Sequence, residues 1–151
     1  MQLSAEYKNF DITILFQGAM GALLRFGTES GDIGNYMKHS HDNRWSIDNP
    51  SAEHPRLAIR NDTWYSGGEY ATNTYNLFNK NYLRLKNVEL GYNVPVSLSQ
   101  KLAISNLRIY VNGLNLVTWD KYKIFDPEAD NAGLQYYPQS RVLNTGVRLT
   151  F

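Results

Sequence analysis

Apolar and polar residues alternate in five stretches of the chain, and this period of two predicts five β-strands. The stretches span residues 2–8, 10–17, 81–93, 106–119 and 141–151. The first two are joined by Lys8-Asn9, so we predict that they form a hairpin. The alternation of the second stretch continues as far as Leu24, which predicts a strand unusually long for a globular sheet.

Each predicted strand collects apolar side chains on one face. These residues are Ile12, Ile14, Val88, Leu90, Ile109, Val111, Val147 and Leu149. Polar side chains fall on the opposite face, namely Glu89, Arg108, Asn112, Asn144 and Arg148. Arg84 and Lys86 are in phase with the apolar set of their strand, so we expect them beyond the apolar band, near its outer rim.

The connections between the predicted strands differ greatly in length. Residues 27–77 and 120–140 are aperiodic and polar, whereas Val94-Pro95 leads into a short helical turn. Ser97 as N-cap with Gln100 three residues later predicts a capping box there. A loop of roughly fifty residues is evidence against a compact domain, but long loops on one side and short turns on the other are usual in outer-membrane barrels.

Five antiparallel strands cannot close a membrane barrel, because every strand edge in the membrane must be paired. The sequence therefore predicts an all-β slice of a larger transmembrane barrel. The last stretch has eleven residues, which fits the ~9–11 residues of a tilted membrane strand.

Composition agrees with this interpretation without proving it. The net charge of +1 argues against a dedicated nucleic-acid binder, and the absence of cysteine excludes disulfides and cysteine-ligated zinc. A negative mean hydropathy is compatible with alternating barrel strands. The opening MQLSAEYKNF lacks the features of a signal peptide, so we expect an export signal upstream, in a longer protein.

Several ordered sequence blocks resemble the C-terminus of SusC/RagA-type TonB-linked outer-membrane receptors of Bacteroidota. The blocks are YLRLKNVELGY, LRIYVNGLNLVTW, KYKIFDPE and YPQSRVLNTGVRLTF, and AEYKNFDITILFQGAMGA resembles an upstream hairpin of the same family. Residues 1–151 would then be the C-terminal segment of such a receptor barrel. Residues 27–65 are the least distinctive part of the match.

The resemblance implies a large plugged barrel in the bacterial outer membrane that imports oligosaccharides or peptides. It implies three kinds of partner besides the membrane lipid: a SusD-like surface lipoprotein, the TonB complex, and the barrel-assembly machinery. The signal peptide, the plug and the TonB box are expected to lie outside this chain, so the chain alone should transport nothing. The substrate itself is not identified by the sequence.

Aromatic residues in or beside the predicted loops are candidates for substrate binding, because their rings offer flat apolar faces. The residues chosen for this role are Trp64, Tyr65, Trp119, Tyr122 and Phe125, and Tyr136 and Tyr137 lie in similar positions. The alternative is structural: an aromatic girdle at the membrane interface or packing within a loop.

The terminal strand is the candidate barrel-assembly signal. Its apolar face carries Leu143, Thr145, Val147, Leu149 and the final Phe151. An exposed strand edge with a free carboxylate suits recognition by β-strand addition.

No catalytic, metal or cofactor site is predicted. The sequence has no nucleophile elbow, HExxH motif or phosphate-binding glycine loop, so we do not expect an enzyme. Asp126, Glu128 and Asp130 alternate but do not match a calcium loop, and we expect the Asp-Pro-Glu turn to fix the shape of its loop. His39 and His41 lack a third ligand.

The main rival is a soluble carbohydrate-binding β-sandwich. A sandwich would bury its apolar face against a second sheet, whereas a barrel wall would leave one continuous apolar face uncovered.

Overall fold

The structure is a computed structural model that describes residues 1–25, 36–59, 62, 74, 77–121, 123–129 and 137–151. The chain divides into two compact units. The first comprises residues 1–20, 81–121 and 138–151, and the second comprises residues 21–80 and 122–137.

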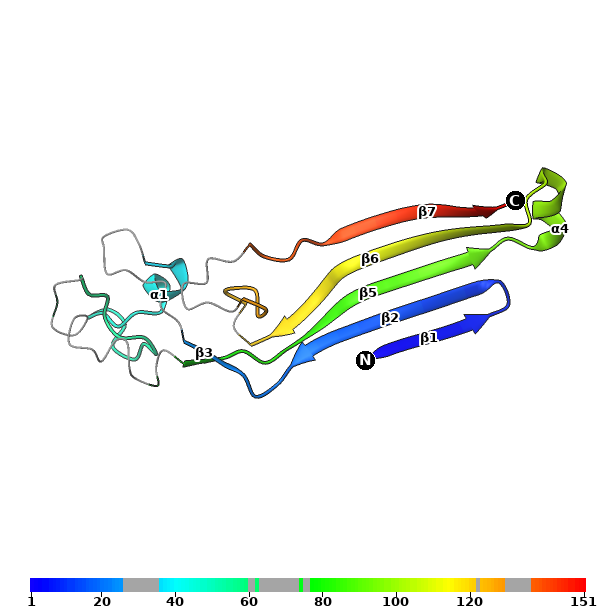
Figure 1. The fold of residues 1–151 in the computed structure, drawn as a ribbon. Coiled ribbons are helices and arrows are strands. Elements are labelled where there is room, and N and C mark those ends of the chain that lie inside the picture. Colours follow the sequence, from blue (N-terminus) through cyan, green and yellow to red (C-terminus); the bar gives the residue numbers. More distant parts are fainter. Residues whose placement is uncertain (26–35, 60–61, 63–73, 75–76, 122, 130–136) are drawn as a thin grey trace. The chain divides into compact units, whose positions relative to one another are not determined.

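The first unit is a single antiparallel sheet of five strands in the order β1-β2-β5-β6-β7 (Figure 1). The strands are β1 (Gln2–Tyr7), β2 (Phe10–Ala19), β5 (Tyr82–Asn93), β6 (Asn106–Asp120) and β7 (Val142–Thr150). All five predicted strands are therefore present, and each pairs antiparallel with its neighbour.

The predicted hairpin forms, with Tyr7 paired to Phe10 across the turn at Lys8-Asn9. Lys8 has a positive φ of 55°, as tight hairpin turns often require. Asn9 ties this turn to the neighbouring strand: its Nδ2 donates to the carbonyl of Asn93 at 2.8 Å, and Asn93 N donates back to the Asn9 carbonyl at 2.8 Å. The turn end of the sheet is thus held by both backbone and side chains.

A β-bulge interrupts the middle of the sheet. On β5, Asn87 pairs with Leu114 but Leu85 pairs with Val117, so the register shifts between them. Asn115 in β6 takes up the extra length with a positive φ of 52°. A bulge reverses which side chains share a face, so residues before and after it must be assigned separately.

This reversal makes the prediction for Arg84 wrong. Arg84 pairs with Gln17 and Thr118, its Nε donates to Thr118 Oγ1 at 2.9 Å, and only 2% of its surface is exposed. It lies with the polar side chains rather than at the rim of the apolar ones. Lys86 lies in the bulge itself and is half-buried.

The predicted helical turn is present between β5 and β6, as α4 (Val96–Ser99) followed by the 3-10 turn η2 (Gln100–Leu102). The capping box is wrong. The helix begins two residues earlier than expected, with Pro95 as N-cap, so Ser97 is already inside it and no side chain caps the end. Proline at φ −53° sets this start, and Ala103 at φ 56° ends the turn.

The second strand does not run on to Leu24 as predicted. It stops at Ala19, and Gly21 turns the backbone with φ +77°. A separate short pair follows in the second unit, β3 (Leu23–Arg25) with β4 (Leu77–Asn79). Glycine accepts this conformation at no steric cost, which explains why the alternating sequence does not remain one strand.

Among its described residues, the second unit also contains a short helix, α1 (Lys38–Asp42), and isolated β-bridges that join Arg44 to His54 and Ser46 to Asn49. The buried apolar residues among those described are Leu24, Ala58, Phe78 and Ala129, and all four belong to this unit. No helix in the described part of the chain is long and apolar enough to cross a membrane.

Candidate functional site

The sheet has one continuous apolar face, built from rows of side chains that cross all its strands. Side chains of paired residues lie on the same face of a sheet. One such row is Ala5, Ile12, Leu90, Val111 and Thr145, and the next is Tyr7, Phe10, Tyr92, Ile109 and Val147. The eight residues expected to share this face therefore do so, and we call it the apolar face.

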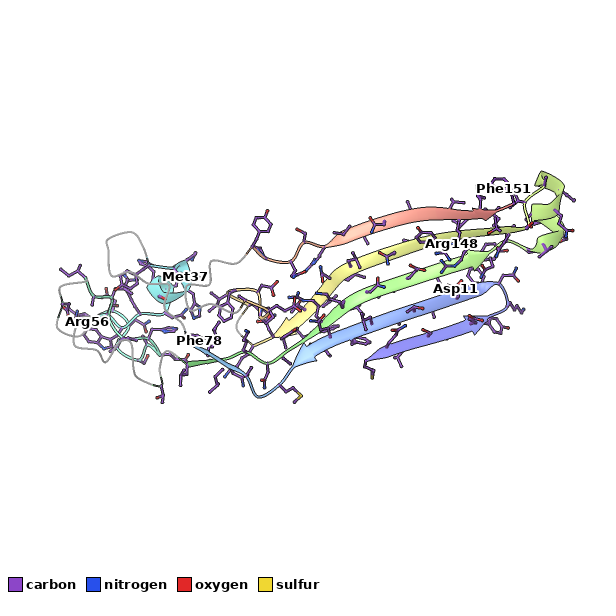
Figure 2. All side chains as sticks on the ribbon, in the orientation of Figure 1. Asp11, Met37, Arg56, Phe78, Arg148 and Phe151 are labelled. Carbon is purple, nitrogen blue, oxygen red and sulfur yellow. The ribbon has the colours of Figure 1, made fainter. Side chains whose placement is uncertain are left out.

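This face is uncovered. Val111, Val147 and Leu149 keep 53%, 59% and 47% of their surfaces exposed, and Figure 2 shows side chains projecting from a single layer of strands. Packing against a second sheet would bury such residues. The exposed apolar face differs from the covered one expected of a β-sandwich, so the structure does not favour that alternative.

The height of the apolar face can be estimated along β5. Leu83 and Tyr92 both lie on it and are nine positions apart, which is about 30 Å at ~3.4 Å per residue. With a strand tilt of ~40° this becomes about 23 Å, close to the ~25 Å apolar band of outer-membrane barrels.

Aromatic rings stand at both limits of this band. At the turn end, the rings of Phe10 and Tyr92 lie 4.8 Å apart, in the row that includes Tyr7. At the other end, Trp119 pairs with Leu83 and is 50% exposed. Rings at two levels are the pattern expected of interfacial girdles.

The opposite face of the sheet, which we call the polar face, is organised around Arg108. Its Nε donates to Asp11 Oδ2 at 3.1 Å, and its Nη2 donates to Asp11 Oδ1 and to Glu89 Oε1, the latter at 2.8 Å. Asn93 Nδ2 also donates to Asp11 Oδ2, at 3.1 Å. One guanidinium thus holds carboxylates from two other strands, β2 and β5.

Two glycines make room for this cluster. A Cβ at Gly91 would clash with the guanidinium of Arg108, and one at Gly146 would lie 2.5 Å from the ring of Tyr110. The Arg108 guanidinium in turn stacks over the Tyr110 ring, 5.3 Å from its centroid. Glycine at these positions allows long side chains to lie flat across neighbouring strands.

Amides continue the polar face toward β7. Asn112 Nδ2 donates to Asn87 Oδ1 at 2.7 Å, and Asn144 Nδ2 donates to Asn112 Oδ1 at 3.4 Å. Arg148 pairs with Arg108 in the strand register and so lies on the same face. The five residues predicted for this face are all found there, whereas sequence reasoning missed the link between Asp11 and Arg108.

The candidate substrate-binding residues are not brought together in the described part of the chain. Trp119 lies on the apolar face at the end of β6, and Phe125 is half-buried in the second unit. Trp64, Tyr65, Tyr122 and Tyr136 lie outside the described residues. The role of these residues in binding substrate remains a prediction.

The Asp-Pro-Glu turn has the shaping role expected of it. Asp126 Oδ1 accepts a hydrogen bond from the backbone N–H of Glu128 at 2.9 Å, and its carbonyl accepts one from Ala129 N at 2.9 Å. Asp130 lies outside the described residues. A carboxylate that caps its own turn in this way fixes the loop.

The ring of His39 lies against that of His54. The rings of His39 and His54 meet edge to face with centroids 4.9 Å apart. Partial burial, together with the nearby His39, lowers the pKa of His54. In the ranges that the structure describes, no three potential metal ligands form a group.

The terminal strand β7 is an edge of the sheet in this chain. Leu143, Val147 and Leu149 are exposed on its apolar face, and Phe151, just beyond the strand, is 85% exposed. This geometry is compatible with an assembly signal, and that role remains a prediction.

Comparison with known proteins gives consistent matches in sequence. TonB-dependent receptor P3 of Formosa agariphila is 33% identical over 165 residues, an alignment covering 97% of this chain and 15% of that receptor. TonB-dependent receptor P26 of the same organism is 29% identical, with 97% and 16% covered. The chain therefore spans about a sixth of the length of these relatives. No protein-family model matches the sequence.

Solved structures give the same result. The structure of the RagAB peptide transporter matches with a TM-score of 0.76 and 30% identity, covering 99% of this chain and 16% of that one. The RagAB peptide importer in its "open-open" state matches with a TM-score of 0.74 and 29% identity, covering 99% and 16%. Sequence and fold thus agree that this chain corresponds to one segment of a large TonB-dependent receptor of the SusC/RagA type.

Proposed function

We propose that this chain forms part of the barrel wall of an outer-membrane TonB-dependent transporter that imports nutrients such as oligosaccharides or peptides. The observation that carries the proposal is the two-faced single sheet. Its uncovered apolar face has the height of a membrane, and its other face is lined by hydrogen-bonded charges and amides. A wall between lipid and a polar lumen needs this division of side chains.

The sheet must be continued by strands outside this chain. β1 and β7 are its edges, and an unpaired strand edge in lipid would leave backbone groups without hydrogen-bond partners. We therefore place residues 1–151 as one wall segment of a closed barrel, with the plug and the other strands supplied by the rest of the receptor.

The connections give the wall an orientation. β1 joins β2 through two residues, and β5 joins β6 through α4, so both short connections lie at the same end of the strands. The long connections, from β2 to β5 and from β6 to β7, leave from the other end. Barrels of this class carry short periplasmic turns and longer extracellular loops. We therefore assign the end with the long connections to the cell surface.

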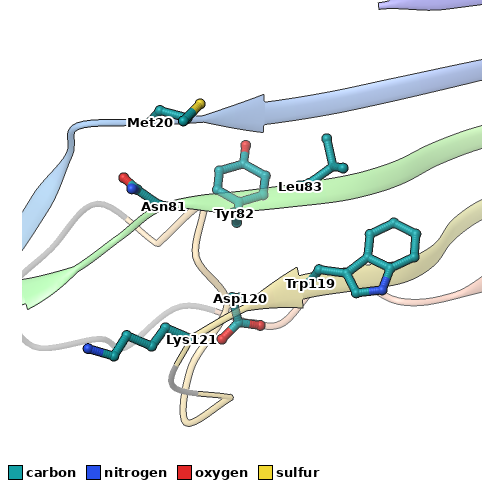
Figure 3. A pocket seen from close by; sticks show the side chains of 7 residues that line it. All are labelled: Met20, Asn81, Tyr82, Leu83, Trp119, Asp120 and Lys121. Carbon is teal, nitrogen blue, oxygen red and sulfur yellow. The ribbon is translucent and has the colours of Figure 1, made fainter.

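The proposed partners are a nutrient substrate, a SusD-like lipoprotein, TonB and the barrel-assembly machinery. The matched solved structures are of RagAB, described as a peptide transporter, which supports a peptide substrate and a SusD-like lipoprotein at the cell surface. The candidates for substrate contact in the predicted loops are Trp64, Tyr65, Tyr122 and Phe125. The fifth candidate, Trp119, lies on the apolar face at the end of β6 (Figure 3). TonB would act through the part of the receptor outside this chain, and the assembly machinery would recognise β7.

The two faces can be tested with spin labels in the full-length receptor. Single cysteines at Ile109, Val111 and Leu107 should give labels that collide with oxygen in the membrane. Labels at Arg108, Tyr110 and Asn112 should instead collide with a water-soluble nickel complex. Nickel accessibility that is equal on both sets would contradict the wall assignment, and the strictly alternating result would support it.

A further inference from the structure

The long connection between β2 and β5 carries a tight turn with an apolar residue at its tip. Ser46 N donates to the Asn49 carbonyl at 3.4 Å, and Asn49 N donates back to the Ser46 carbonyl at 3.0 Å. The two residues between them, Ile47 and Asp48, form the tip. Turn tips are usually built from Gly, Pro, Asn, Asp or Ser, because these residues fit the turn backbone or hydrogen-bond to it. Asp48 follows that rule, whereas formation of the turn does not explain Ile47.

Packing within the chain does not explain Ile47 either. Its side chain is 88% exposed, and Trp45, two residues before it, is 44% exposed. The buried apolar residues among those described all lie outside residues 43–54. Single exposed apolar residues are common on protein surfaces, but two large ones in one short turn concentrate apolar surface there. Such a concentration is typical of a site that another molecule covers.

Hydrogen bonds within its own segment hold the turn in shape. Trp45 N donates to the His54 carbonyl at 2.8 Å, and His54 N donates to the Asn43 carbonyl at 3.3 Å. The hydrogen bonds that the structure describes for residues 43–49 all end within residues 39–54. A turn fixed in this way presents its exposed side chains without the entropic cost of ordering a loop on binding.

The shape of this surface indicates what kind of molecule covers it. Ile47 stands at a convex tip, so its partner must supply a concave apolar pocket. Small nutrients are bound the other way round, in concave pockets of the receptor. A folded protein can supply such a pocket, and apolar or aromatic side chains seated in one are the usual anchors of protein interfaces. The β2–β5 connection leaves the sheet at the end assigned to the cell surface, where the proposed protein partner is the SusD-like lipoprotein.

We propose that residues 43–54, which we call the docking turn, bind an apolar pocket of the SusD-like lipoprotein with Ile47 and Trp45 as anchors. The proposal rests on the proposed function, because it requires this connection to lie at the cell surface and the lipoprotein to be a partner. It goes further by naming the segment of this chain that makes the contact. The internal hydrogen bonds then fix the backbone, and the exposed apolar side chains supply the contact area.

The test measures binding of the SusD-like lipoprotein, purified from the same outer membranes, to the full-length receptor in nanodiscs by biolayer interferometry. Ile47→Asp should raise the Kd at least about tenfold, because a charged group would replace an apolar anchor in a pocket. Ile59→Asp is the matched control and should leave the Kd unchanged, since Ile59 is another exposed isoleucine of the same connection, outside the docking turn. Ile47→Val keeps a branched apolar side chain and should bind nearly as tightly as the unmodified receptor.

A photo-reactive benzoylphenylalanine in place of Ile47 identifies the partner directly. Illumination of intact cells should cross-link the receptor to the lipoprotein, and the same group in place of Ile59 should not. A cross-link only to another part of the receptor, equal Kd values for Ile47→Asp and Ile59→Asp, or no binding by the unmodified receptor would overturn the docking turn. Any of these results, in a receptor whose Ile109 and Val111 labels face lipid, would leave the wall assignment intact. Labels exposed to water at those two positions would instead contradict the proposed function.

Discussion

Arg108 and Asp11 are 97 positions apart in the chain, yet the guanidinium of one donates two hydrogen bonds to the carboxylate of the other. They sit on β6 and β2, with β5 between them, and Glu89 of β5 accepts a third bond from the same guanidinium. The pair therefore ties together strands that do not touch through their backbones. Its side chains are 15% and 21% exposed, so water competes only weakly for these bonds.

Replacing Arg108 with leucine should destabilise the receptor by about 2 kcal/mol, because two carboxylates lose a charged hydrogen-bond partner while half-buried. The measurement is urea-induced unfolding of the full-length receptor from vesicles. Arg148→Leu, on the same face but exposed, is the control and should change stability by less than about 0.5 kcal/mol. Equal losses in the two variants would show that the Arg108 cluster contributes nothing specific.

Gly146→Ala should destabilise the receptor by about 1–3 kcal/mol, because the added methyl group would enter the space held by the Tyr110 ring. A second substitution, Tyr110→Ser, removes the ring and should recover most of that loss when combined with Gly146→Ala. The double-mutant cycle is measured in the same unfolding experiment. Additive effects, with no recovery, would contradict the steric explanation.

The strands and the sides of their residues could be predicted from sequence because period-two alternation survives in each strand taken alone. Residues such as Val111 and Asn112 need no partner to reveal their faces. The bulge could not be predicted, since it arises from the register of β5 against β6 and not from either sequence alone. Arg84 was placed on the wrong face for that reason.

The hydrogen bonds of the polar cluster could not be predicted from sequence either. Alternation assigns Asp11, Glu89 and Arg108 to one face, but which carboxylate reaches which cation depends on the stagger of three strands. Gly91 offers a signal in retrospect, because a glycine within a strand often marks close approach of another group. The start of α4 at Pro95 likewise depends on where β5 ends, which is set by its pairing with neighbouring strands.

A charge on the apolar face should impair the receptor much more than the same charge on the polar face. Val111→Lys is expected to destabilise the inserted barrel by about 2–4 kcal/mol, since Val111 lies mid-band and faces lipid in the proposed wall. The adjacent Asn112→Lys is the matched control, with its side chain on the opposite face. The readout is the amount of folded receptor in isolated outer membranes, and similar losses for both variants would contradict the assignment of faces.

Acidification should loosen the loop segment around His54. The pKa of His54 lies below its ordinary 6.5 because burial and His39 disfavour the charged ring. The unfolded segment therefore binds the proton more readily, so the folded segment is favoured above pH 6.5 and loses stability as the pH falls below it. Trp45 N donates to the His54 carbonyl at 2.8 Å, and its amide hydrogen exchange should accelerate on acidification after correction for intrinsic rates.

The control for this pH effect is His41→Gln, because His41 is exposed and its ring pairs with Asp42, whereas the shift of the His54 pKa comes from burial and His39. His54→Gln should abolish the pH dependence of exchange at Trp45, whereas His41→Gln should leave it unchanged. Persistence of the pH dependence in His54→Gln would assign the effect to another group.

Phe151→Asp should lower the amount of receptor inserted in the outer membrane, without a matching loss of stability once the barrel has folded. Within this chain the side chain is 85% exposed just beyond the edge strand β7, so a substitution removes little packing against the other strands of this sheet. Phe151 would instead act in recognition of β7 by strand addition, for which an exposed edge and a terminal ring are suited. Phe151→Tyr keeps the ring and should insert normally, whereas Thr150→Asp tests whether any added charge at this end has the same effect. The comparison uses folded receptor per cell and the unfolding midpoint of purified protein. A drop in the midpoint as large as the drop in abundance would make Phe151 a packing residue.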